Sequence, residues 1–215
     1  MNDAIIMINK FLGAVILFLF LSGAVFSQQT HVFIDAEKEY KEAKQLFTQK
    51  QYALAYPLLQ AVKQQQQDNQ KTNATYLYDD VNYYYTVCRL KLLLPVAAEE
   101  ASQYIDWINN APRAQLMSYH LGKYYFQKDD FQNAISNYEN AGLDNLSNEE
   151  IADVKFEMGY CYFNLKQFDK ARPLFNEIHQ LPESKYFIPA NYYHGFISFY
   201  DHKSVSYTHL TLPTN

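Results

Sequence analysis

Two stretches of the sequence repeat one residue pattern: LGKYYFQKDDFQNAISNYENA at positions 121–141 and MGYCYFNLKQFDKARPLFNEI at positions 158–178. In each, a glycine is followed by an aromatic residue and then by an alanine at matching places. A pattern that returns after about 36 positions is typical of a repeat protein, in which each unit stacks on its neighbours to bury its apolar face. The two stretches therefore predict an array of similar helical units.

Fainter copies of the pattern lie on both sides of these stretches. In the second copy Arg89 and Ser102 stand where large apolar residues are expected, so its register stays open by about one residue. A small side chain in the first helix of a unit would let the second helix approach closely. The small positions are Ala43, Thr86, Gly122, Gly159 and Gly195, and the alanines of the second helices are Ala55, Ala98, Ala134 and Ala171.

This pattern resembles the tetratricopeptide repeat, a helix–turn–helix unit with Leu-Gly in its first helix and small-then-aromatic positions in its second. The resemblance covers about residues 35–202 and implies an all-α fold, a right-handed α-solenoid of four full units and a truncated fifth. The first helix of the fifth unit would lack its partner and would expose Phe196 and Phe199. The expected units lie at about residues 36–69, 79–112, 115–148 and 152–185, with a partial unit at 188–203.

The two ends of the chain differ from this array. Residues 11–27, FLGAVILFLFLSGAVFS, form an apolar run after Lys10 and end in small residues, so residues 1–27 are expected to be a secretory signal peptide. An uncleaved membrane anchor is the alternative.

Residues 204–215, SVSYTHLTLPTN, carry no helical period and look like translated sequencing-adapter sequence, so they are expected to be a non-native tail. A genuine frayed terminus is the alternative there. The array proper would then span residues 28–203.

Composition narrows the class of function. The net charge of −5 belongs to residues 28–203, and a mildly acidic array without a basic run gives no reason to expect nucleic acid as a partner. Cys88 and Cys161 stand at equivalent positions two units apart, which is too far for a disulfide, so both are expected to be buried thiols. A dimer bridged by an exposed cysteine is the alternative.

The resemblance also implies where a partner would bind. In tetratricopeptide proteins the concave groove is lined mainly by the first helix of each unit, and here an aromatic residue recurs at the fifth position of that helix. Aromatic side chains exposed in a groove would anchor an extended peptide or a helix, whereas the alternative is that they are core residues. Two lysines could hold a peptide carboxylate. The candidate groove residues are Tyr40, Lys44, Tyr83, Tyr119, Lys123, Phe156, Tyr160, Tyr192 and Phe196.

The sequence contains no HExxH, CxxC, GxSxG or Gly-Lys-Thr motif, and its histidines show no metal-ligand spacing. We therefore expect no enzyme activity, no cofactor, no metal and no small-molecule substrate.

A signal peptide followed by tetratricopeptide units resembles envelope proteins of Gram-negative bacteria. That resemblance implies an exported, periplasmic or envelope-associated scaffold that binds a protein or peptide, with membrane contact only through an uncleaved N-terminal segment. The alternatives are the sensor region of a membrane-anchored signalling protein, or an envelope tether, with its C-terminal domain missing.

Overall fold

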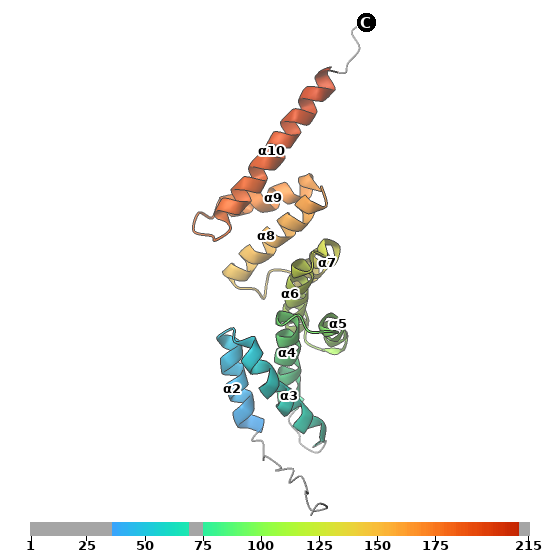
Figure 1. The fold of residues 1–215 in the computed structure, drawn as a ribbon, viewed down its shortest axis with the longest axis vertical. Helices are drawn as coiled ribbons and strands as arrows, with labels where there is room; N and C mark the ends of the chain where they lie inside the picture. Colours follow the sequence, from blue (N-terminus) through green and yellow to red (C-terminus); the bar gives the residue numbers. More distant parts are fainter. Residues whose placement is uncertain (1–35, 69–74, 211–215) are drawn as a thin grey trace, which may run out of the picture. The chain divides into compact units, whose positions relative to one another are not determined.

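The computed structural model describes residues 36–68 and 75–210, and every regular element in these two ranges is an α-helix (Figure 1). The predicted all-α class is confirmed for this part of the chain. The predicted signal peptide at residues 1–27 lies outside the described residues. The helices are α2 (Ala36–Thr48), α3 (Tyr52–Asp68), α4 (Thr75–Lys91), α5 (Ala97–Trp107), α6 (Ala111–Gln127), α7 (Phe131–Ala141), α8 (Asn148–Asn164), α9 (Phe168–His179) and α10 (Phe187–Leu210).

Successive helices pack in pairs, and the pairs stack on one another. Helix α2 packs on α3, α4 on α5, α6 on α7 and α8 on α9, while α10 packs on α9. The first helix of each pair also meets the first helix of the next pair, because α4 lies against both α2 and α6, and α6 against α8. The architecture is therefore repeat-like, as the sequence pattern predicts.

The same turn joins the two helices of every pair. Lys50, Leu93, Asp129 and Lys166 each adopt a left-handed backbone conformation, with φ between 53° and 60°. In the fourth pair the Lys166 amide donates to the Phe163 carbonyl and the next amide, of Gln167, donates to the Tyr162 carbonyl. These two bonds form a Schellman motif, which ends a helix and favours glycine at the left-handed residue. None of the four positions carries glycine.

Two of the predicted packing glycines are confirmed. A Cβ atom at Gly122 would lie 2.7 Å from the ring of Tyr138, and one at Gly159 would lie 2.8 Å from the ring of Phe175. Nothing lies within 4 Å of the place where the Cβ of Gly195 would be, which agrees with the expectation that the first helix of the fifth unit lacks its partner. In the described residues no second helix covers that side of α10.

The second pair uses a register one residue earlier than the sequence alignment. The side chains of α5 that face the core are Ala97, Ala101 and Tyr104, whereas the aligned Ala98 and Ser102 are partly or fully exposed. Val96, a second left-handed residue just before α5, rotates the start of this helix. Ala101 therefore occupies the position that Leu59, Tyr138 and Phe175, which are all larger, hold in the other pairs.

Helix α10 continues to Leu210 and so includes residues 204–210 of the predicted tail. The expectation that residues 204–215 are a non-native tail stays a prediction, and residues 211–215 lie outside the described range. Among the described helices, none combines the length and the apolar character that crossing a membrane requires.

Candidate functional site

Most of the aromatic residues predicted to line the groove lie inside the molecule. Tyr40, Tyr83 and Tyr119 are each less than 9% exposed, because the first helix of the next pair covers each ring. The ring of Tyr83, for example, lies 6.2 Å from the ring of His120 on α6. The expectation that these three rings stand exposed in a groove is therefore wrong. They form the interface between successive helix pairs.

The two candidate lysines differ in their surroundings. Lys123 is largely buried and donates to Asp153 at 2.9 Å and to Glu157 at 2.7 Å, so its charge is already balanced inside the molecule. This overturns its expected role as a free cation for a peptide carboxylate. Lys44 is exposed, and its ammonium lies 5.5 Å from the ring centroid of Tyr84.

The candidate groove residues nearer the C-terminus are more exposed. Phe156 is half-buried, with its ring stacked 4.4 Å from that of Tyr186, and Tyr160 lies 5.5 Å from Tyr193 in an edge contact. Tyr192 is 66% exposed and Phe196 is 43% exposed. The candidate groove residues are thus not brought together on one open surface, and only those on α10 present large exposed rings.

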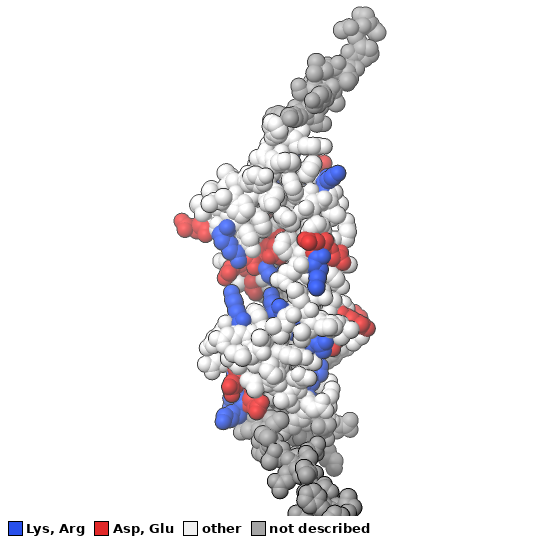
Figure 2. Space-filling model, in the orientation of Figure 1, with Lys and Arg blue, Asp and Glu red and all other residues white. Residues whose placement is uncertain are grey.

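Helix α10 carries the broadest exposed apolar face among the described helices. Residues 187–200 contain no Lys, Arg, Asp or Glu, and this segment is white in the space-filling view, next to a charged middle region (Figure 2). The predicted exposure of Phe196 and Phe199 is confirmed. Among residues 187–201 of this helix, the exposed large apolar side chains are Ile188, Tyr192, Phe196, Phe199 and Tyr200.

Two aspartates, which the sequence patterns did not single out, hold neighbouring pairs together. Asp80 on α4 accepts a 2.8 Å hydrogen bond from the Tyr40 hydroxyl and forms an ion pair with Arg113. The carboxylate thereby joins α2, α4 and α6. Each of these groups is at least half-buried, so the ion pair is shielded from solvent more than a surface pair would be.

Asp153 on α8 makes the same kind of connection further along the chain. It accepts hydrogen bonds from Lys123 at 2.9 Å, from Tyr119 at 3.4 Å and, through its other oxygen, from Tyr186 at 2.9 Å. Lys185 adds an ion pair at 2.7 Å. Burial alone would raise the pKa of Asp153, but the hydrogen bonds from Lys185 and Lys123 outweigh it and lower this pKa.

A repeated dipeptide in the sequence marks these two aspartates. Asp80-Val81 and Asp153-Val154 are the same dipeptide at equivalent places of the second and fourth pairs, where the cysteines also recur. Both cysteines are free and fully buried, as predicted, and burial raises the pKa of each thiol to about 12.

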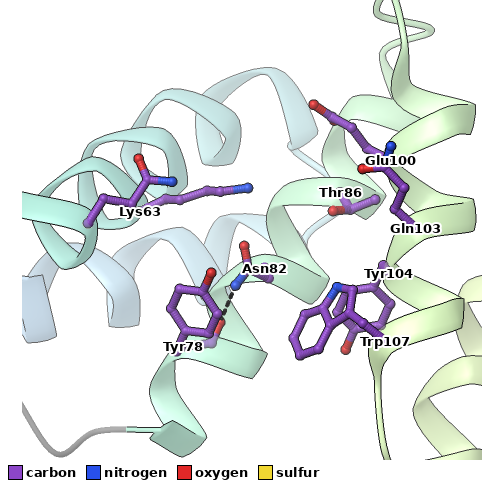
Figure 3. Close-up of a pocket in the computed structure, with 9 residues that line it drawn as sticks. Lys63, Tyr78, Asn82, Thr86, Glu100, Gln103, Tyr104 and Trp107 are labelled. Atoms are coloured by element: carbon purple, nitrogen blue, oxygen red, sulfur yellow. Dashed lines mark hydrogen bonds between the residues drawn. The ribbon is translucent and has the colours of Figure 1, made fainter. Parts of the chain in front are cut away.

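A cleft lies between α3, α4 and α5, on the side formed by the second helices of the pairs (Figure 3). Its volume is about 460 Å³. In Figure 3, Lys63 of α3 lies on one side and Glu100 and Gln103 of α5 lie on the other, with Asn82 between them. No sequence pattern indicates this cleft, because residues of three separate helices line it.

No family model and no curated protein matches this chain. In the described residues, His, Cys, Asp and Glu side chains form no group of three that could hold a metal ion.

Proposed function

We propose that the chain is a right-handed helical repeat array of the tetratricopeptide type that binds a protein partner and catalyses no reaction. The recurring helix pairs, their shared turn and the close packing at Gly122 and Gly159 support the repeat assignment. In such an array the stacked units create an extended surface that is available for binding.

The observation that carries the proposal is the uncharged face of α10. Tyr192 occupies the position of Tyr40, Tyr83, Tyr119 and Phe156. Each of these rings meets the first helix of the next pair, and Phe156 does so through Tyr193 of α10. The face around Tyr192 therefore has the chemistry of an interface that receives a helix. Exposed aromatic residues supply large contact areas at a low cost in side-chain entropy, and large apolar patches mark interaction sites.

We also propose that the protein acts in the cell envelope, as an exported scaffold. The support is the apolar run at residues 11–27, which has the length and flanks of a signal peptide. A fusion of residues 1–35 to a reporter enzyme that is active only outside the cytoplasm should give activity. A fusion that gives none would contradict this localisation.

The binding surface can be tested by substitution. The double variant Tyr192→Ser with Phe196→Ser should lose co-purifying partners that the unmodified chain retains, because both side chains are exposed and their loss leaves the core intact. Leu54→Ser is a matched control, since Leu54 is 58% exposed and lies on α3. Partners lost equally from both variants, or from neither, would contradict the proposed surface.

A further inference from the structure

The cleft between α3, α4 and α5 has an aromatic ledge at its edge. Tyr78 is 41% exposed and Trp107 is 49% exposed, and their ring centroids lie 6.4 Å apart with the planes tilted by 50°. Trp107 also meets the buried ring of Tyr104 edge-on at 5.4 Å, which holds it in place. The two exposed rings give the polar cavity an apolar, aromatic edge.

The rest of the cleft is rich in hydrogen-bond donors. Lys63, Gln67 and Gln103 line it from α3 and α5, and the indole N–H belongs to the ledge itself. Asn82 is held by a 3.0 Å hydrogen bond from its amide nitrogen to the Tyr78 carbonyl. A ligand that fits this lining presents several acceptors and an apolar face.

The lining also holds a carboxylate oxygen without a partner. One oxygen of Glu100 accepts from Arg89 at 2.8 Å, whereas its Oε2 atom is shielded from solvent and has no hydrogen-bond partner among the described residues. A buried acceptor left unpaired is costly, so a ligand N–H group at this place would be stabilised. The Arg89 charge balances that of Glu100, so the site does not call for a cationic ligand.

A second cleft, of about 370 Å³, lies one helix pair further along, between α5, α6 and α7. Equivalent positions line both clefts, but the side chains differ: Asn137 stands in place of Glu100 and Ser118 in place of Asn82, and the second cleft has no aromatic ledge. A polymer of identical sugar units would favour like subsites, whereas a peptide carries different side chains along a uniform backbone. The observations therefore favour a peptide.

We propose that the α3–α4–α5 cleft binds an extended peptide segment that contains proline. Proline rings pack on flat aromatic surfaces, and the extended polyproline conformation leaves its carbonyl groups unpaired as acceptors for donors such as those in the cleft. An N–H group of a residue other than proline would meet Glu100. The proposal rests on the proposed protein-binding function but uses a surface separate from the α10 face.

Trp107 is the only tryptophan of the chain, so its fluorescence reports on this cleft alone. Decaproline should shift the emission of the purified full chain in a saturable way, and a ten-residue Gly-Ser peptide should not. The binding constants of variants come from the anisotropy of fluorescein-labelled decaproline. Trp107→Ala and Tyr78→Ala should each weaken binding about tenfold or more, the loss typical of truncating an aromatic anchor.

Three results would overturn the proposal: no emission shift with millimolar decaproline, unchanged affinity in the Trp107 and Tyr78 variants, or a shift produced by tetra-N-acetylchitotetraose but not by decaproline. The last result would make the cleft a sugar site. Circular dichroism establishes that both variants fold, and the two substituted side chains are about half exposed. Tyr192→Ser should leave decaproline binding unchanged. The decaproline experiment therefore tests the cleft alone, and its failure would not contradict the proposed partner surface on α10.

Discussion

The hydroxyl of Tyr40 donates a 2.8 Å hydrogen bond to Asp80, which belongs to the next helix pair. The same relationship recurs between Tyr119 and Asp153, at 3.4 Å. In both cases a tyrosine that the sequence places in an open groove is instead fixed beneath the next helix by an aspartate. Stacking of the pairs thus depends on a small number of buried polar contacts in addition to apolar packing.

Replacement of Asp153 by Asn should reduce the free energy of unfolding by about 2–3 kcal/mol, because Lys123 would lose one of its two carboxylate partners inside the protein. Chemical denaturation at neutral pH measures this loss. Glu149→Gln is the control, since Glu149 lies 3.5 Å from Lys185 but is 69% exposed, and it should cost less than about 0.5 kcal/mol. Equal effects of the two variants would contradict the role assigned to Asp153.

The contribution of Asp153 should depend on pH. Its pKa is lower in the folded chain than in the unfolded chain, so its stabilisation is fully present above the ordinary aspartate pKa of about 3.9 and is lost as the pH falls through the lower, folded value. The stability difference between the unmodified chain and Asp153→Asn should therefore be constant from pH 5 to 7 and shrink below about pH 4. A difference that grows on acidification would refute this assignment.

The two glycines at equivalent helix positions should respond oppositely to alanine. Gly122→Ala should lower the free energy of unfolding by about 1–3 kcal/mol, because the new methyl group would overlap the ring of Tyr138. Gly195→Ala should raise it by up to about 1 kcal/mol, because its site is open and alanine favours helix. Thermal melts of the two variants give the comparison, and a loss of stability in both would contradict the described surroundings of Gly195.

The left-handed turn residues offer a route to higher stability. Lys166 is exposed and has φ of 58°, so Lys166→Gly should stabilise the chain by about 0.5–1 kcal/mol by relieving backbone strain. Lys170→Gly, inside α9, should instead destabilise by about 1 kcal/mol. The two midpoints of urea denaturation should move in opposite directions, and a shared direction would show that the turn is not strained.

The sequence pattern predicted the helices well because it depends on local residue spacing. The glycine and aromatic positions of the third and fourth pairs are set by close contact within one pair, at Gly122 with Tyr138 and at Gly159 with Phe175. Such contacts restrict the residue types at fixed spacings, so they can be predicted from the sequence.

The candidate site was predicted less well, because exposure depends on the helices of neighbouring pairs. Nothing in the residues around Tyr83 indicates that α6 covers its ring, whereas Tyr192 has the same local pattern and stays exposed. The cleft beside Trp107 is formed by three helices, and the contact of Trp107 on α5 with Tyr78 on α4 cannot be found from local residue spacing.

A photo-cross-linking amino acid placed at position 192 in living cells would show whether the aromatic face of α10 receives a protein partner, with position 54 as the control of similar exposure. We expect a discrete cross-linked protein at position 192 that is absent at position 54 and is identified by mass spectrometry. Cross-links at position 54 alone, or the same products at both positions, would contradict it.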